Sequence, residues 1–331
     1  MLDPDEPGPT TPRHDADDVD PWVVVVNYGS SELVERNFAA LDRAGRASTH
    51  VVVVDNYSGA GERAAVAEVC SRHAWTLVPM TGNAGFAAAC NAGVREARRA
   101  GAQSVLLVNP DAVVTTPVAV QLAAQVQEEP MTLVAPLVLN SAGGVYFQGS
   151  RLDLRSGRIR GRRWADQPVG PEYLVSDPPW RDWLTGACLA FSVALWERTG
   201  GLDEGYFLYW EDVDFSQRCS EAGARLCLRR DLVVVHDEGA THGTQGSRAR
   251  SALYYRYNCR NRLRYAALHL TRRELLRWVA ATPQESWQIL LRGGRRQLLE
   301  SPEPLLATFR GSMEGLSAAV PALLSSRGPR G

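Results

Sequence analysis

Short apolar runs alternate with segments of helical spacing along the first 140 residues of the chain. The apolar runs are rich in β-branched residues and cover residues 22–28, 51–58, 75–80, 104–112 and 132–139. Between them, apolar residues recur every three or four positions at residues 31–45, 61–73 and 84–101. Thr116 and Pro117 predict the N-cap and the first position of another helix. This alternation predicts an α/β fold with a mostly parallel, doubly wound sheet.

The pattern changes beyond residue 140. Residues 142–182 lose periodicity and gain Gly, Arg and Pro, which predicts a hairpin followed by a long loop. Order returns at residue 183, and the next predicted elements are two short strands and an arginine-rich helix, at residues 225–229, 232–236 and 248–270. Amphipathic segments fill the remainder of the chain, with breaks at Gly293-Gly294 and Pro302.

Charge is distributed unevenly although the net charge is only −1. Residues 1–20 hold seven carboxylates and one arginine, which predicts a disordered acidic tail. From Arg225 onward there are eighteen arginines against eight acidic residues, and no lysine occurs anywhere in the chain. The near-neutral total gives no indication of a nucleic-acid partner. The basic C-terminal helices have two interpretations: they pack on the α/β domain, or they attach peripherally to anionic lipid.

Six scattered cysteines show neither a C-x-x-C pair nor a histidine at zinc-finger spacing. Buried free thiols in a reducing compartment are therefore the preferred interpretation. The N-terminus lacks the basic and apolar regions of a signal peptide, and no run of about 18 apolar residues predicts a membrane span. We expect a cytoplasmic protein, with peripheral attachment to the inner face of the membrane as the variant.

Polar side chains occur where the first four predicted strands end: Asn27, Asp55, Asn83 and Asp111. In doubly wound sheets, ligands bind at the carboxyl ends of the strands, so these side chains should meet at one edge. Asp55 can accept hydrogen bonds from the base and ribose of a nucleotide, or it can cap a turn or the next helix.

Asn109-Pro110-Asp111 places a carboxylate beside a rigid proline at the end of the fourth strand. Such a group suits a divalent cation that is also bound by diphosphate oxygens, although an aspartate at a strand-to-turn junction explains the same string. His236 ends the last short strand on the side where the same cation would lie. It is either a second metal ligand or a structural histidine.

Three carboxylates stand within four residues at 211–214, directly after an aromatic run. The following residues predict a helix, so these acids occupy its first turn, where one or two of them can stabilise the helix dipole. Crowding all three is costly unless a cation or a substrate compensates. An aspartate here that faces a sugar pocket can act as the general base on an acceptor hydroxyl.

Together these segments resemble glycosyltransferase family 2, in its rhamnosyltransferase-like branch with the GT-A fold. The resemblance runs from about Trp22 to Leu270. Its segments, in order, are VVVVNY, VVVVDNYS, GNAGFAAACNAG, LLVNPDA, GACLAF, GGLDEGYFLYWEDVDFSQR and a histidine before YYRYNCRN. It implies an acidic tail at 1–20, a catalytic domain at 21–245 with nucleotide-binding and acceptor halves at 21–140 and 141–245, and a helical extension at 246–331.

The resemblance also implies roles for single residues. Donor binding falls on Asn27, Tyr28, Asp55, Asn83, Gly85, Phe86, Asn91, Asn109 and Asp111. Asp111 and His236 would hold Mg²⁺ or Mn²⁺. Asp212 would be the general base. Glu211 and Asp214 would orient the acceptor or the helix, and Trp210 would stack on a sugar. Many relatives carry Asp-x-Asp where this chain has Asn-Pro-Asp, so one metal carboxylate is absent.

The expected activity is an inverting, metal-dependent transfer of a sugar, with rhamnose or another deoxyhexose as the first choice. The donor would be a TDP- or UDP-linked sugar, and the acceptor a hydroxyl of a glycan, a lipid-linked glycan or a natural product. A homodimer is compatible with the sequence. The absence of lysine disfavours a nucleotidyltransferase, and Tyr28-Gly29-Ser30 is no dinucleotide-binding G-x-G-x-x-G. A non-catalytic, sugar-nucleotide-binding subunit with the same fold is the remaining alternative.

Overall fold

The computed structural model describes residues 19–41, 49–164, 170–236 and 250–324. Strands and helices alternate through its first half. The strands are β1 (Trp22–Asn27), β2 (His50–Asp55), β3 (Thr76–Pro79), β4 (Ser104–Val108), β5 (Ala112–Val113) and β6 (Thr132–Asn140). The helices are α1 (Ser31–Phe38), α2 (Ala60–His73), α3 (Phe86–Arg99) and α4 (Thr116–Glu128). The predicted α/β alternation is confirmed.

The second half adds shorter strands and most of the helical mass. Its strands are β7 (Val145–Phe147), β8 (Ser150–Asp153), β9 (Arg158–Gly161), β10 (Pro171–Leu174), β11 (Trp180–Trp183), β12 (Cys188–Ser192) and β13 (Arg225–His236). Its α-helices are α5 (Val193–Thr199), α6 (Glu211–Glu221), α7 (Ala252–His269), α8 (Arg272–Leu290), α9 (Gln297–Glu300) and α10 (Glu303–Leu324).

The main sheet has the strand order β10-β13-β6-β12-β4-β1-β2-β3, with β5 beside β13 and β7 beside β6. Strands β3, β2, β1, β4, β6 and β13 run in one direction, because β12 is antiparallel to both β4 and β6. The sheet is therefore mostly parallel, as expected, with β12 as an antiparallel strand in its middle.

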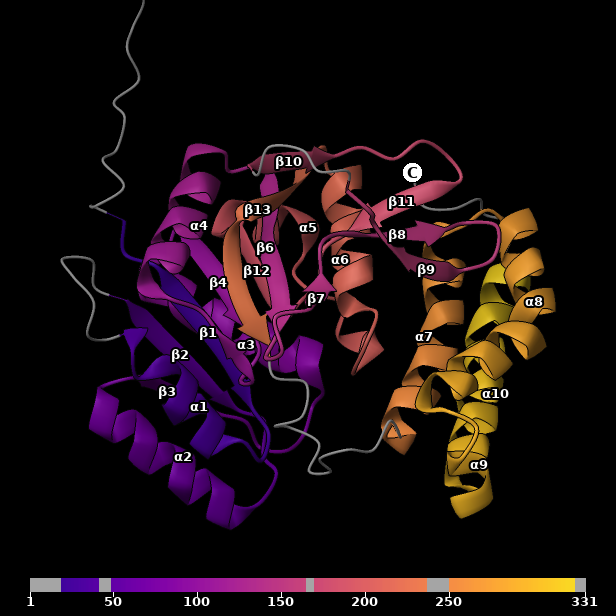
Figure 1. The fold of residues 1–331 in the computed structure, drawn as a ribbon, viewed down its shortest axis with the longest axis horizontal. Coiled ribbons are helices and arrows are strands. Elements are labelled where there is room, and N and C mark those ends of the chain that lie inside the picture. Colours follow the sequence, from indigo (N-terminus) through magenta and orange to yellow (C-terminus); the bar gives the residue numbers. More distant parts are fainter. Residues whose placement is uncertain (1–18, 42–48, 165–169, 237–249, 325–331) are drawn as a thin grey trace, which may run out of the picture.

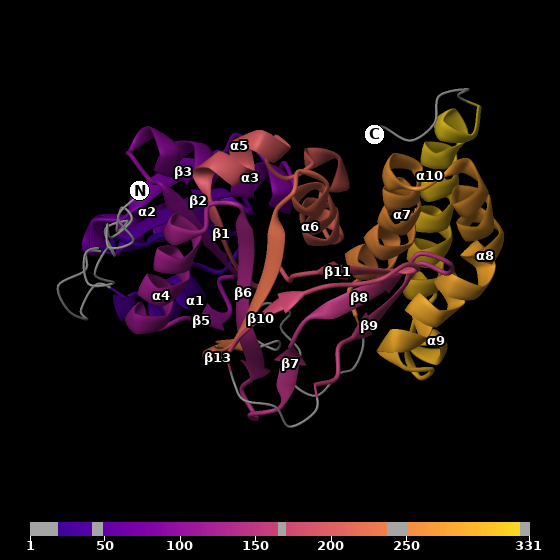
Figure 2. The ribbon, with the colours of Figure 1, turned by 90° about the horizontal axis from the view of Figure 1, so that it is seen from above.

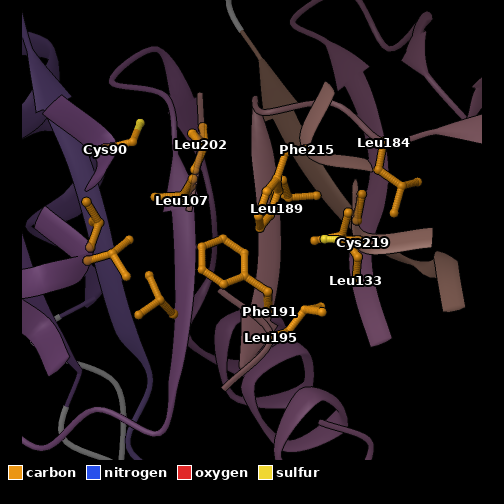
Figure 3. Packing of buried hydrophobic residues seen from close by; sticks show 14 of the residues in the cluster. Cys90, Leu107, Leu133, Leu184, Leu189, Phe191, Leu195, Leu202, Phe215 and Cys219 are labelled. Carbon is orange, nitrogen blue, oxygen red and sulfur yellow. The ribbon is translucent and has the colours of Figure 1, made fainter. Parts of the chain in front are cut away.

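Alternating residues of the central strands face two separate cores. Val24 and Val26 pack with α3, α5 and α6 on one side, whereas Val23 and Val25 pack with α1, α2 and α4 on the other. Figure 3 shows the first of these cores, where side chains from β4, β12 and α6 interlock. Gly93 lets α3 approach the sheet, since a Cβ there would lie 2.3 Å from Val24. This double covering explains the continuous apolar strands.

The segment 142–182 differs most from expectation. The predicted hairpin is present as β8 and β9. In place of the predicted loop, β11 joins this hairpin in a separate three-stranded sheet, and β7 and β10 extend the main sheet. The burial of these strands explains the error: β11 is half-buried at every position, and β9 is half-buried or exposed throughout. Such strands carry no continuous apolar run for a sequence pattern to detect.

Helices α7, α8 and α10 pack together beside the sheet domain (Figures 1 and 2). The predicted breaks at Gly293-Gly294 and Pro302 are confirmed, since both fall between helices. Trp278, Tyr265 and Trp210 form the centre of a third core, which joins these helices to the start of α6. No helix in the described parts of the chain is both long and apolar enough to cross a bilayer.

Several element boundaries change. Helix α1 ends at Phe38, helix α4 is capped by Thr115 rather than Thr116, and residues 225–236 form one strand with an irregularity between Arg229 and Val233. All six cysteines are buried free thiols, as predicted. The acidic tail up to residue 18 and the boundary at residue 245 lie outside the described residues.

Candidate active site

Asn27 and Asp55 lie side by side at the carboxyl edge of the sheet, because strand register pairs them directly and pairs Asp55 with Pro79 of β3. Both side chains are fully buried. Asn27 Oδ1 accepts hydrogen bonds from the amide and the hydroxyl of Ser30, at 3.0 and 3.1 Å. Its Nδ2 group is buried and finds no acceptor among the described residues. A buried donor of this kind is available to a ligand.

Asp55 forms an ion pair with Arg63, whose Nε lies 2.6 Å from its Oδ2. The guanidinium of Arg63 sits 4.6 Å above the ring of Tyr57 and also donates to the carbonyl of Met80. Asp55 accepts the amide of Tyr57 at 3.2 Å, so it stabilises its own turn. It does not cap the next helix, because Gly59 occupies that position. Both of its oxygens are engaged, yet each retains lone pairs for a further donor.

Asn83, Gly85 and Phe86 fix the start of α3. Asn83 Oδ1 accepts from Asn56 Nδ2 at 3.1 Å and from the Gly85 amide at 3.0 Å. Gly85 has φ +91°, and a Cβ there would lie 2.6 Å from the carbonyl oxygen of Phe207. The Phe86 amide donates to that same carbonyl at 2.6 Å. The beginning of α3 is thus bonded to the loop that precedes α6.

The side-chain amide of Asn91 makes four hydrogen bonds, two through each of its polar atoms. Its Nδ2 donates to Leu202 O and Glu204 Oε1, and its Oδ1 accepts from the amide of Leu202 and from Trp196 Nε1, all within 3.2 Å. With a side chain buried and satisfied in this way, Asn91 shapes the site only indirectly, by anchoring the loop after α5. The expectation of a direct donor contact is corrected accordingly.

Asp111 and His236 meet where β13 pairs with β5. The carboxylate Oδ1 lies 3.1 Å from His236 Nε2, and Asn109 Nδ2 is 3.4 Å from the same nitrogen. Both Asp111 and His236 are buried. The exposed ring of Tyr146 stacks on the imidazole at 4.6 Å between centroids. Nδ1 of His236 is buried without a partner among the described residues.

This donor set fits a divalent ion shared with a substrate. Within the described ranges no group of three or more His, Cys, Asp or Glu residues could hold a metal alone. Two adjacent ligands of an octahedral ion at about 2.1 Å lie roughly 3.0 Å apart, close to the 3.1 Å between Asp111 Oδ1 and His236 Nε2. Mg²⁺ typically takes one or two protein ligands and completes its shell with phosphate oxygens and water.

Asp212 lies in the first turn of α6. Its Oδ2 accepts the Gly186 amide at 3.1 Å, and its Oδ1 accepts the Val213 amide at 2.8 Å. Burial raises the pKa of Asp212 to about 6, and the backbone amides offset only part of that effect. Ala187, next to Gly186, accepts the amide of Asn109 at 3.0 Å. Asp212 is therefore connected through two backbone contacts to the strand end that carries Asp111.

The three acids of this turn have different environments. Glu211 is buried with Oε2 unpartnered among the described residues, and burial together with the charge of Asp212 raises its pKa to about 8. Asp214 accepts from His269 and Arg218 at 2.7 Å each. Burial acts to raise the Asp214 pKa, but the bond from His269 and the charge of Arg218 hold it below its ordinary value. Asp214 thus links α6 to α7, which fits the expectation that it orients the helix rather than the acceptor.

Trp210 does not face a sugar pocket. Its side chain is 5% exposed, and its ring packs against Tyr265 and Trp278 with centroids 5.7 and 6.4 Å away. The expected stacking on a sugar is therefore wrong for this residue. The exposed rings near the strand ends belong instead to Tyr28, at 52% exposure, and to Tyr57 and Tyr146.

Three site residues escape sequence reasoning. Arg63 pairs with Asp55 one turn into α2, Tyr146 covers His236, and Gly186 holds Asp212 through its backbone. The sequence gives a weak indication of Arg63, because a basic residue eight positions after a strand-end aspartate falls near the same edge of the sheet. Tyr146 has none, since it lies on a strand that the pattern does not predict.

Residues 22–172 match the family described as glycosyl transferase family 2. N-acetylglucosaminyl-diphospho-decaprenol L-rhamnosyltransferase of Mycobacterium tuberculosis (strain ATCC 25618 / H37Rv) is 29% identical over 240 residues, which cover 67% of this chain and 77% of that protein.

Two solved structures share the fold. GalNAc-T7 with UDP, GalNAc and Mn²⁺ superposes with a TM-score of 0.58 and 16% identity, over 76% of this chain and 48% of that one. The mannosyltransferase PcManGT from Pyrobaculum calidifontis, in complex with GDP-Man and Mn²⁺, has a TM-score of 0.51 and 18% identity, over 98% and 92%. The chain therefore has the GT-A fold, and the part of it that matches glycosyl transferase family 2 is residues 22–172.

Proposed function

We propose that this chain is an inverting, metal-dependent glycosyltransferase that moves a sugar from a nucleoside diphosphate to an acceptor hydroxyl. The observation that carries the proposal is the placement of Asp212. Its carboxylate is held by two backbone amides, has a pKa raised to about 6, and is connected through Gly186-Ala187 to the strand end of Asp111. A general base works best when its pKa lies just below the operating pH.

In this mechanism the acceptor oxygen attacks the anomeric carbon while the bond from that carbon to the diphosphate oxygen breaks. Asp212 takes the proton that the acceptor hydroxyl loses. Glu211, whose raised pKa keeps it protonated near neutral pH, leaves the negative charge of the pair on Asp212. The amides of Gly186 and Val213 hold that carboxylate in one orientation. One attack from the side opposite the leaving group inverts the anomeric carbon.

Donor recognition falls on the other strand ends. The buried Nδ2 of Asn27 and the carboxylate of Asp55 are suited to the nucleoside, and the exposed ring of Tyr28 is suited to stacking on the base. Asp111 and His236 would hold Mg²⁺ or Mn²⁺, which when bound stabilises the charge of the departing diphosphate. TDP-rhamnose is our first choice of donor, because the relative from M. tuberculosis is named an L-rhamnosyltransferase. That name also favours a lipid-linked glycan as acceptor.

The test is donor hydrolysis and transfer by Asp212→Asn. We expect a fall of about 10²–10⁴-fold in turnover, with nucleotide binding unchanged. Asp231→Asn, which alters a surface ion pair with Arg229 on β13, is the matched control and should keep full activity. Full turnover by Asp212→Asn would remove this residue from the mechanism. Nucleotide binding without any turnover by the wild-type protein would favour the non-catalytic subunit instead.

A further inference from the structure

Helix α10 presents an apolar face to solvent. Six large apolar side chains recur along it at helical spacing with exposures of 48% to 80%: Leu305, Leu306, Phe309, Met313, Val320 and Leu324. We call this set the α10 face. A continuous exposed apolar strip of this length is unusual for a soluble surface and indicates a binding site.

The α10 face cannot turn inward, because the opposite side of the helix is fixed against α7. A Cβ on Gly311 would lie 2.0 Å from the carbonyl oxygen of Arg256, and one on Gly315 would lie 3.0 Å from that of Arg260. These glycines let the backbone of α10 lie directly against the backbone of α7. Arg256 and Glu314 form a salt bridge across the same contact. The rotation of α10, and with it the outward direction of its apolar face, is thus built into the packing.

The face continues onto the neighbouring segment. Leu305 shares a hollow of about 390 Å³ with Trp287 of α8 and with Leu298 and Leu299 of α9. Leu299 is 90% exposed and Trp287 is 49% exposed. A tryptophan beside leucines at a water-facing edge is the side-chain composition found where proteins enter the headgroup region of a bilayer.

Arginines border this end of the face. Arg292, Arg295 and Arg296 are exposed in the turn between α8 and α9, and Arg310 is exposed on α10. Arg295 and Arg296 form no ion pair with the described residues, while Arg310 pairs with Glu314. Two acids, Glu300 and Glu303, lie nearby, so the border is net basic.

From this combination we propose that the α10 face, with Leu299 and Trp287, docks on an anionic lipid bilayer and lies in its interface without crossing it. Charge decides between this occupant and a second copy of the chain. A second copy offers this border either the same arginines or the uncharged C-terminal part of α10, whereas anionic headgroups neutralise it.

Vesicle co-sedimentation of the full chain tests the proposal. At low salt we expect at least tenfold tighter binding to vesicles of phosphatidylcholine with phosphatidylglycerol than to phosphatidylcholine alone, and weaker binding as salt rises. Leu306→Ser with Phe309→Ser should weaken binding at least tenfold without changing the melting temperature, because both side chains are more than 60% exposed. Arg295→Gln with Arg296→Gln should weaken it about 30-fold, at about 1 kcal/mol per arginine.

Val175→Ser is the matched control, since this apolar side chain is 79% exposed on the sheet domain and should leave vesicle binding unchanged. Failure of the wild-type chain to bind anionic vesicles at low salt would overturn the proposal. So would a concentration-dependent dimer in light scattering that Leu306→Ser with Phe309→Ser dissociates, in the absence of vesicle binding. Because sedimentation needs no donor or acceptor, its result is independent of the proposed transfer.

Discussion

At the residue scale, the first turn of α6 shows how neighbouring carboxylates acquire separate tasks. Asp214 is paired with His269 and Arg218 and has a lowered pKa, whereas Asp212 accepts only backbone amides and has a raised one. Helical geometry separates their side chains by about 200° around the axis. The sequence could predict that one of these acids is catalytic, but the partners that distinguish them come from α7 and from the residues before β12.

The raised pKa of Asp212 predicts an acidic limb in the pH profile. A base must be ionised to accept a proton, so kcat/KM should be level above pH 6 and fall about tenfold per unit below it. In Asp212→Asn, kcat/KM should be low at every pH and should lack this acidic limb. The measurement is kcat/KM for transfer between pH 4.5 and 8, with unfolding followed in parallel at each pH. A limb that survives in Asp212→Asn would assign it to another group.

Gly85 predicts a second residue-scale effect. Gly85→Ala places a Cβ against the carbonyl of Phe207 at a φ of +91°, so we expect about 2–4 kcal/mol of destabilisation and impaired donor binding. Chemical unfolding and nucleotide titration measure the two effects. Gly82→Ala is the matched control, since nothing lies within 4 Å of its Cβ position, and it should change neither quantity by much. Equal stability of the two variants would show that the loop before α6 moves away from the added methyl group without lowering the free energy of unfolding.

Residue positions were predictable where strand ends define them and not where distant packing does. Asp55 and Asp111 reach the expected edge because parallel strands end together. Trp210 was assigned to a sugar, yet it is buried by Tyr265 and Trp278, which lie more than 50 residues away in the chain. An aromatic beside acidic residues gives no local sign of which surface will cover it.

At the element scale, the contact between α6 and α7 depends on a buried pair. His269 Nε2 lies 2.7 Å from Asp214 Oδ1, and His269 also faces Glu221. Burial acts to lower the His269 pKa, but hydrogen bonds to Asp214 and Glu221 outweigh it and raise the pKa to about 9. The pair therefore ties the first turn of α6 to the last turn of α7.

This pair predicts a stability loss at alkaline pH. A histidine whose folded pKa lies above its unfolded value stabilises fully below pH 6.5 and loses that contribution as pH rises through 9. His269→Gln should therefore cost on the order of 2–3 kcal/mol at pH 6 and much less at pH 9.5. Urea unfolding at both pH values measures it. His50→Gln, at a histidine stacked on Trp22, is the control. A cost independent of pH would mean that packing, and not charge, holds His269.

Element prediction followed the same division. Strands β1, β2 and β4 are buried on both faces and appear as continuous apolar runs, so their existence and order were predictable. Strand β12 has an equally clear run, but its antiparallel direction depends on where the chain enters the sheet between β4 and β6. Strands β8, β9 and β11 rely on partners in their own small sheet and leave little trace in the sequence.

At the scale of the whole molecule, the sheet domain and the C-terminal helices share one core. Trp210, Val213 and Leu152 come from the former, and Leu263, Tyr265 and Trp278 come from the latter. Packing on the α/β domain was one of the two interpretations of the arginine-rich helices, and this core confirms it, so the helices are part of the support for α6 and hence for Asp212. Removing them should therefore expose this core rather than leave an intact catalytic domain.

Ligand binding to the intact molecule gives the last prediction. A nucleotide at 100 times its Kd should add about 2.7 kcal/mol to the free energy of unfolding, which corresponds to roughly 2–4 °C per kcal/mol for a large domain. With UDP, TDP or GDP, the matching base should give this shift in the presence of Mn²⁺, and chelation should reduce it. Asp111→Asn should abolish the dependence on Mn²⁺ while retaining a smaller shift by the nucleotide alone, because Asn27 and Asp55 are untouched.

Asp182→Asn, which changes a buried ion pair with Arg162 in the small sheet, serves as the control for a general loss of stability. A shift in Asp111→Asn that still depends on Mn²⁺ would mean that the metal is bound by other residues, and the assignment of this strand end to the diphosphate would fail.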